Sequence, residues 1–300
     1  MEKGKGVEIV YSEKGIVQVQ YDFQGMGTMK SAIHFNAIGQ IERIELIENF
    51  IKMEMEQQQQ MRENVQIPGS NEVVQRFQPK AISFLSIDGL KISGNLYEVD
   101  PSAPVILLCH QAGYNKAEYL DIAPRLNEMG YNCLAIDQRS GGPFANQQNE
   151  TATMAQKEGK TYSMLDARQD VRAAIDYLSN RYNQKVIVWG SSYSSSLALL
   201  ELDNSQVEAV IAFSPGNYFG KEAPQLQEVL AQSGKPYLVT SSKAESEALS
   251  ELLNEEGMND QQRHFIPASN GFHGSRAVWM GQKGAEEYWD AVKGFLKKLQ

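Results

Sequence analysis

The segment 186–202 constrains the fold more than any other part of this chain. It begins with the apolar run Val-Ile-Val-Trp, passes through the small-residue turn Gly-Ser-Ser-Tyr-Ser, and continues as Ser-Ser-Leu-Ala-Leu-Leu-Glu-Leu, which has helical character. A short apolar strand that leads straight into a helix is typical of a sheet covered by helices on both faces. So tight a turn strains the backbone of its central residue, and only small residues fit beside it. Gly190 and Ser194 occupy the two flanking positions.

Ser192 is the central residue of this turn. A strand–turn–helix with serine at its tip predicts a nucleophile elbow, which lifts the serine hydroxyl above the edge of the sheet. The hydroxyl then lies at a helix N-terminus, where partial positive charge favours a developing anion. Glycine is usual at both flanking positions, so Ser194 departs from the common pattern. Ser192 is the predicted nucleophile, and it requires a base, an acid and oxyanion donors.

Only one of the chain's four histidines lies where the base is expected. In this layout the base follows the last core strand, which excludes His34. His110 precedes the nucleophile, and His264 opens an apolar run and is more typical of a strand. His273 lies in the turn Asn-Gly-Phe-His-Gly just after that run. We therefore predict that His273 is the base.

The acid is expected after the strand predicted at 237–240. Glu245 stands in that place, which gives the chain order Ser192, Glu245, His273 of the α/β-hydrolase arrangement. Aspartate is more usual as the acid, but no aspartate occurs in this segment. Glu247 is the alternative acid.

Two backbone N–H groups are expected to form the oxyanion hole. One belongs to Tyr193, immediately after the nucleophile. The other is assigned to Ala112, in the segment His-Gln-Ala-Gly at 110–113, which is similar to the oxyanion loop after the third strand in this superfamily. Gln111 replaces the glycine that is usual in that loop.

Four motifs, taken in order, resemble the dienelactone-hydrolase and prolyl-oligopeptidase-like group of α/β-hydrolases. They are His-Gln-Ala-Gly at 110–113, Asp-Gln-Arg-Ser-Gly-Gly at 137–142, Gly-Ser-Ser-Tyr-Ser at 190–194 and Gly-Phe-His-Gly at 271–274. The resemblance covers about three quarters of the chain, from residue 79 to the end. It implies serine-hydrolase chemistry, but it names no substrate because this fold hosts many.

The hydrophobic pattern beyond residue 70 agrees with a doubly wound, mostly parallel sheet. Short continuous apolar runs alternate with helical patterns, as in a sheet buried on both faces. The predicted strands are 81–86, 91–98, 105–109, 133–137, 186–189, 209–213, 237–240 and 265–267. The predicted helices are 119–129, 163–180 and 286–299. The polar stretch 140–162 is too long for an ordinary connection, and we expect either a flap over Ser192 or a solvated loop.

Residues 1–70 differ from the rest of the chain. Their short β-like runs alternate with glycine turns, a pattern that predicts an antiparallel meander with strands at 7–11, 16–22, 29–35 and 41–47. A polar helix over 49–66 leads into a linker. We therefore divide the chain into a small β-rich accessory module with a linker helix, 1–70, and an α/β-hydrolase domain, 71–300. The module is expected to be an accessory or dimerising unit, which would give a homo-oligomer, or else a substrate-gating cap.

Composition excludes several classes of partner. A net charge of −9 without basic clusters argues against nucleic acid and anionic membranes. No apolar run approaches the length of about 18 residues that a transmembrane helix needs. No signal peptide is visible, so a cytoplasmic location is the default and the periplasm the alternative if a leader was removed. Cys109 and Cys133 are expected to be buried free thiols, and no His/Cys cluster suggests a metal, so no metal and no cofactor are expected.

Three functions fit these residues. The favoured one is a serine hydrolase that cleaves a small ester or related acyl substrate through a Ser–His–Glu triad and an acyl-enzyme. The second is a peptidase or amidase that uses the same triad, which must also protonate a poor amine leaving group. The third is a non-catalytic binding protein with the same fold, and the presence of all three triad residues argues against it.

Overall fold

The computed structural model describes residues 7–13, 16–23, 27–36, 38–44, 77–160, 162–253 and 255–299. Its contacts divide the chain into two compact units, 1–65 and 66–300. The predicted linker helix at 49–66 and the predicted boundary at 70/71 lie outside the described residues. Among the described residues, no helix combines the length and the apolar character that crossing a membrane requires.

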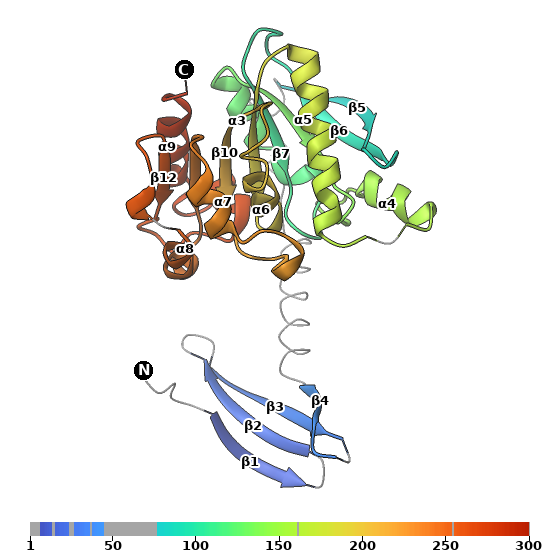
Figure 1. The fold of residues 1–300 in the computed structure, drawn as a ribbon, viewed down its shortest axis with the longest axis vertical. Helices are drawn as coiled ribbons and strands as arrows, with labels where there is room; N and C mark the ends of the chain where they lie inside the picture. The colour runs from blue at the N-terminus through green and yellow to red at the C-terminus, as the bar shows by residue number, and fades with distance from the viewer. Residues whose placement is uncertain are drawn as a thin grey trace. The chain divides into compact units, whose positions relative to one another are not determined.

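The larger unit is built on an eight-stranded sheet with the order β12-β11-β10-β9-β7-β8-β6-β5 (Figure 1). Strands β8 to β12 and β7 pair in parallel, whereas β5 and β6 are antiparallel to their neighbours. The doubly wound, mostly parallel sheet predicted from the sequence is therefore confirmed. The strands are β5 (Lys80–Leu85), β6 (Lys91–Tyr97), β7 (Val105–Cys109), β8 (Asn132–Ile136), β9 (Val186–Ser191), β10 (Val207–Phe213), β11 (Tyr237–Thr240) and β12 (Gln262–Phe265).

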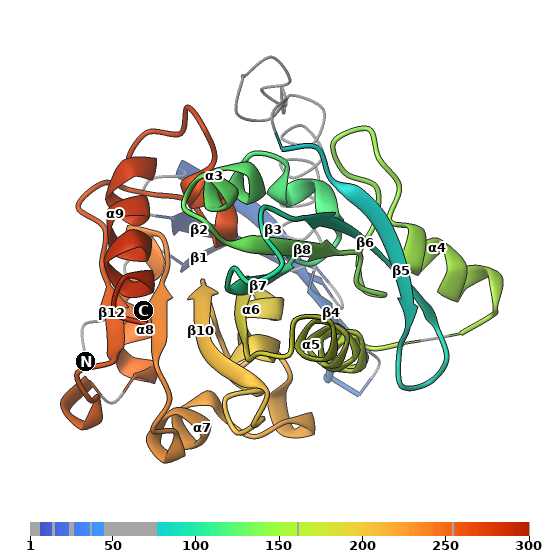
Figure 2. The ribbon, with the colours of Figure 1, turned by 90° about the horizontal axis from the view of Figure 1, so that it is seen from above.

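Helices cover both faces of this sheet (Figure 2). Helices α5 and α6 lie on one face, and α3 and α9 on the other. On the second face Arg125 of α3 stacks over the Trp289 ring of α9, at 4.4 Å from its centroid, and pairs with Glu286. The helices are α3 (Ile122–Glu128), α4 (Glu150–Lys157), α5 (Arg168–Tyr182), α6 (Tyr193–Leu199), α7 (Leu226–Gln232), α8 (Ser246–Leu252) and α9 (Ala285–Leu296).

Burial on two faces explains why the central strands read as continuous apolar runs. Every residue of β7 and β8 is buried. Alternate residues of β7 face opposite sides, so Val105, Leu107 and Cys109 join the core beneath α5. Cys109 and Cys133 are buried free thiols, as predicted.

The last strand was predicted three residues too late. It was expected at 265–267, but β12 covers Gln262–Phe265. As the edge strand it pairs only with β11, so it does not need an apolar residue at every position. Pro267 cannot extend the ladder because it has no backbone N–H.

The smaller unit contains an antiparallel meander in the order β1-β2-β3-β4, which confirms the predicted pattern. In the β3–β4 turn the Asn36 side chain accepts hydrogen bonds from the backbone N–H groups of Ile38 and Gln40. The strands are β1 (Val7–Glu13), β2 (Ile16–Phe23), β3 (Gly27–Phe35) and β4 (Ile41–Ile44). The predicted strand residues 45–47 lie outside the described part of the chain.

A buried ion network fixes the loop after β8. The Arg139 guanidinium is 3% exposed and donates to Asp170, at the start of α5, at 2.7 Å, and to Asp88, in the β5–β6 hairpin, at 2.8 Å. The hydrogen bond from Arg139 holds the pKa of Asp88 down, at about 2. Asp170 is fully buried, and its carboxylate accepts hydrogen bonds from both the guanidinium and the backbone N–H of Arg139. Arg139 therefore braces these loops.

Replacing Arg139 by methionine is expected to lower the free energy of unfolding by about 3–5 kcal/mol, because the change leaves the buried Asp170 carboxylate without its cation. Chemical denaturation measures the difference. The matched control is Arg181→Ala, which removes a half-exposed ion pair to Glu98 and should cost at most about 1 kcal/mol. A loss no larger for R139M than for R181A would contradict this account of the network.

Candidate active site

The turn after β9 holds Ser192 in a conformation that L-residues rarely adopt. Its φ is 56° and its ψ is −127°, and its backbone N–H donates to the Phe213 carbonyl at 2.8 Å. Glycine is required at position 190, because a Cβ there would lie 2.4 Å from the Ser195 Cα. The strained turn that the sequence predicts is thus present, with Ser192 as its central residue.

Position 194, where glycine is common, carries a serine whose hydroxyl both accepts and donates a hydrogen bond. The Ser194 Oγ accepts from the Ser191 backbone N–H at 2.9 Å and lies 2.7 Å from the Cys109 carbonyl, to which it donates. The second contact ties the turn to the end of β7. The departure from glycine therefore adds a link between the two central strands.

Ser192, His273 and Glu245 form a continuous chain of hydrogen bonds. The His273 Nε2 lies 2.8 Å from the Ser192 Oγ, and the His273 Nδ1 is bonded to a Glu245 carboxylate oxygen. When Nδ1 donates its proton to the carboxylate, Nε2 is left as an acceptor for the serine hydroxyl. The Ser192 residue is 9% exposed, whereas the His273 side chain is 45% exposed.

The carboxylate of Glu245 is held in its charged form. Burial raises its pKa, but the hydrogen bond and charge of His273, together with donors on Ser242, outweigh burial and lower the pKa to about 2. The second carboxylate oxygen accepts from the Ser242 N–H at 3.0 Å and from the Ser214 hydroxyl at 2.9 Å. A carboxylate with this many donors can orient an imidazole and stabilise it when it becomes positively charged.

The other candidates from the sequence lie elsewhere. Glu247, the alternative acid, is exposed in the first turn of α8. His264 is a strand residue, as expected, and its Nδ1 lies 2.6 Å from Glu255. His34 belongs to β3 in the smaller unit.

Tyr193 and Ala112 were predicted to supply the N–H groups of an oxyanion hole. Tyr193 is the first residue of α6, and Ala112 lies in the loop after β7. Within residues 77–299, leaving aside Thr161 and Asn254, neither N–H donates to an acceptor in the protein. Free donors at a helix N-terminus and in a fixed loop are the elements from which oxyanion holes are built.

His110 anchors this oxyanion loop. It is fully buried, and its Nε2 accepts from the Gln138 backbone N–H at 2.9 Å. The proton is therefore on Nδ1, which donates to the Gln111 carbonyl at 2.8 Å. Burial lowers the pKa of His110 and keeps the ring neutral. The Asn149 amide approaches the same Nε2 at 3.3 Å and links the stretch 140–162 to this loop.

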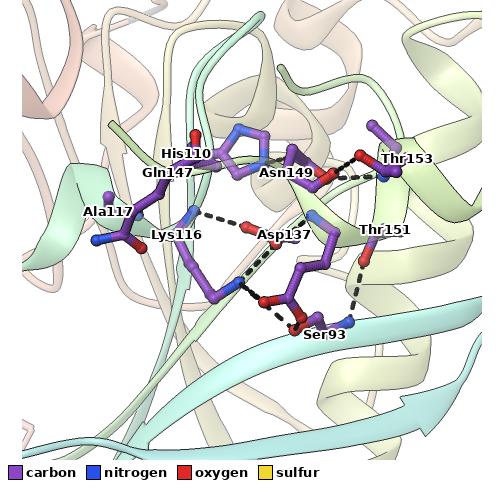
Figure 3. A network of polar contacts seen from close by, with 12 residues as sticks. Ser93, His110, Lys116, Ala117, Asp137, Gln147, Asn149, Thr151 and Thr153 are labelled. Atoms are coloured by element: carbon purple, nitrogen blue, oxygen red, sulfur yellow. Dashed lines mark hydrogen bonds and ion pairs between the residues drawn. The ribbon is translucent and has the colours of Figure 1, made fainter. Parts of the chain in front are cut away.

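A network of polar contacts that runs from buried Lys116 and Asp137 to exposed Glu150 lies near His110 (Figure 3). The Lys116 ammonium lies 2.7 Å from Asp137 and 3.4 Å from Glu150, and the Glu150 carboxylate accepts from the Ser93 hydroxyl. Asn149 caps α4 by accepting from the Ala152 N–H. The stretch 140–162 is therefore not a bare solvated loop, because it carries a capped helix fixed to the loops after β7 and β8.

Ser214 and Tyr218, which the sequence reasoning did not select, also lie at the site. The Ser214 hydroxyl donates to Glu245 and accepts from the Gly274 N–H at 3.0 Å. It therefore links Glu245 to the loop that carries His273. Burial raises the pKa of Tyr218, and a hydrogen bond with Ser192 opposes the rise. Both residues follow β10, next to the elbow strand, and that position is the signal that could have identified them.

Among the described residues, no group of three or more His, Cys, Asp or Glu side chains is placed to hold a metal ion.

Comparison with known proteins identifies the family of the larger unit. Residues 92–300 match the dienelactone hydrolase family over more than half of the chain. A search of curated proteins finds no match.

Solved structures agree on the fold. An esterase from Pyrococcus furiosus aligns with a TM-score of 0.56 at 17% identity, over 75% of this chain and 92% of that chain. The α/β-hydrolase GrgF from a Penicillium species gives 0.57 at 15% identity, over 73% and 98%. A dienelactone hydrolase from Anabaena variabilis gives 0.54 at 16% identity, over 74% and 98%. The family match and the shared architecture lead to one conclusion: this chain belongs to the dienelactone hydrolase family and is a hydrolase with the α/β-hydrolase fold.

Proposed function

We propose that this protein is a serine hydrolase that cleaves a small ester or related acyl substrate through an acyl-enzyme. The observation that carries the proposal is the unbroken hydrogen-bond chain from Ser192 through His273 to Glu245. Structural relatives described as an esterase and as a dienelactone hydrolase support the same class of substrate.

The proposed reaction has two halves. The Ser192 Oγ attacks the acyl carbonyl while the His273 Nε2 takes the hydroxyl proton, and the resulting imidazolium is stabilised by Glu245. The oxyanion is bound by the N–H groups of Tyr193 and Ala112. The imidazolium then gives its proton to the leaving alcohol. Water, activated by the same histidine, releases the acid and restores the serine.

An ester is favoured over an amide for two reasons. An alkoxide leaves more readily than an amide anion, so ester cleavage depends less than amide cleavage on protonation of the leaving group. The connection at 214–225, which follows β10, holds only a short 3-10 turn (Gly220–Glu222), and the His273 side chain is about half exposed. Such a site suits a small substrate that enters from solvent.

Labelling with a fluorophosphonate probe tests the nucleophile. We expect one adduct on Ser192, found by mass spectrometry, because the probe reacts with serines activated by a base. Ser192→Ala is expected to abolish the adduct. Ser196→Ala, which removes a buried hydroxyl on the next turn of α6, serves as the matched control and should still be labelled at Ser192. Folded wild-type protein that takes no label would remove the support for a serine hydrolase.

Ester and anilide substrates with the same acyl group separate the first two candidate functions. We expect hydrolysis of the p-nitrophenyl ester and little or none of the anilide. Comparable values of kcat/KM for the two would instead favour an amidase.

Replacing Glu245 by glutamine is expected to lower kcat by about 10⁴-fold, the usual cost of removing the charge that holds the triad histidine. The same change predicts a pH-dependent loss of stability. The pKa of Glu245 falls from 4.5 to about 2 on folding, so while His273 is protonated the charge of Glu245 contributes stability that disappears as the pH falls from 4.5 toward 2.

Urea denaturation of both proteins at a series of pH values measures this contribution. The difference in unfolding free energy between wild type and E245Q should shrink as the pH falls from 4.5 toward 2. A difference that stays constant through the acid range would contradict the assigned role of the charge. Glu247→Gln, on the exposed side of the same helix, is the control and should change neither kcat nor the pH profile.

A further inference from the structure

Glu118 is a buried carboxylate that the proposed reaction does not use. It lies in the 3-10 turn Lys116–Tyr119 after the oxyanion loop and is 1% exposed. Within the described residues it forms no ion pair, although burying a charge without a cation is costly. Burial raises its pKa to about 7, against the hydrogen bonds that lower it. The hydrogen bonds that its two carboxylate oxygens accept explain why a carboxylate is buried here.

Each oxygen of Glu118 accepts a hydrogen bond from a different part of the active site. Oε2 accepts from the Gln111 backbone N–H at 2.7 Å, in the oxyanion loop. Oε1 accepts from the Ser191 hydroxyl at 2.6 Å, one residue before the nucleophile. The Gln111 N–H is adjacent in sequence to the peptide group that carries the free Ala112 N–H, so Glu118 fixes the oxyanion loop from behind.

Ser191 extends this contact to the histidine loop. Its Oγ accepts from the Ser275 backbone N–H at 2.8 Å while donating to Glu118. The approach is close, because a Cβ at Gly274 would lie 2.6 Å from the same oxygen. The Trp279 indole N–H donates to the Glu118 carbonyl at 2.9 Å and ties the following segment to the same turn.

Two segments distant in sequence therefore meet at one carboxylate, the oxyanion loop at 110–113 and the elbow at 190–194. A third, the histidine loop at 271–275, is joined to them through the Ser191 hydroxyl. We propose that Glu118 is a positioning residue that sets the relative placement of the Ala112 N–H, Ser192 and His273. The inference rests on the proposed function. Glu118 touches neither substrate nor a reacting atom, and it acts through Gln111 and Ser191.

The charged form suits this role because it accepts at both oxygens. The Gln111 backbone N–H can only donate. The Ser191 hydroxyl accepts from the Ser275 N–H and offers its proton to Glu118. Without the carboxylate, two buried donors lose their acceptor and the three segments can shift apart. A displacement of about 1 Å in such a site costs about 10²-fold in rate.

The rate constant and the final extent of fluorophosphonate labelling together test the inference on the full-length chain. For Glu118→Ala we expect a rate constant about 10²-fold lower than for wild type. The extent of labelling reports only how much protein is folded, so a merely structural role would lower the extent and leave the rate constant unchanged. With p-nitrophenyl acetate, kcat should fall by a similar factor while KM changes little.

Glu201→Gln is the matched control, since Glu201 is also fully buried but pairs with Arg168 and Arg172 at the far end of α6. It should lose stability and keep the wild-type rate constant. If Glu118→Ala does not fold, Ser191→Ala decides the question, because it removes only the hydroxyl that joins Glu118 to Ser275. We expect it to lower the rate constant about 10-fold, the cost of one lost hydrogen bond to a charged group.

The outcomes separate the two proposals. Wild-type protein that takes no label at Ser192 overturns the proposed function, and this inference with it. Wild-type labelling at Ser192 combined with an unchanged rate constant in Glu118→Ala, or in Ser191→Ala where the former does not fold, overturns the role of Glu118 alone.

Discussion

The close approach of α6 to the end of β9 is the constraint on which the rest of this site depends. At Gly190 there is no room for a side chain, since the backbone of the following helix occupies the space. In the same tight turn Ser192 has a positive φ, and its hydroxyl contacts His273. Glu245 and His273 are linked to that hydroxyl by hydrogen bonds, and buried polar groups help to hold the loops that carry them.

The loops at the carboxyl edge of the sheet are ordered by polar contacts as well as by the stacked rings of Tyr114, Phe144 and Trp279. His110 holds the oxyanion loop from one side and Glu118 from the other. Asp137 and Arg139 do the same for the loop after β8. Buried networks of this kind are specific only when every member is satisfied, and they fail together when one member is removed. The site is therefore sensitive to residues that never approach the substrate.

Much of the fold was predictable from the sequence, because burial on both faces leaves a strong apolar signal in β7, β8, β9 and β10. The edge strand β12 was misplaced since an edge carries a weaker signal. The order Ser192, Glu245, His273 was also predictable, because the motifs occur at fixed places relative to the strands. Ser214, Tyr218 and Glu118 were missed, since their contacts join segments far apart in sequence and no local pattern records them. The role of the N-terminal module stays a prediction.

The hydroxyl of Ser214 contacts both the Glu245 carboxylate and the backbone N–H of Gly274, next to His273. Acid and histidine are spaced by a bond that exists before any substrate arrives. The conformational entropy lost in aligning them is therefore lost during folding, and binding does not need to supply it. A hydrolase built in this way can act on weakly bound molecules, since little of their binding energy is diverted into arranging the enzyme.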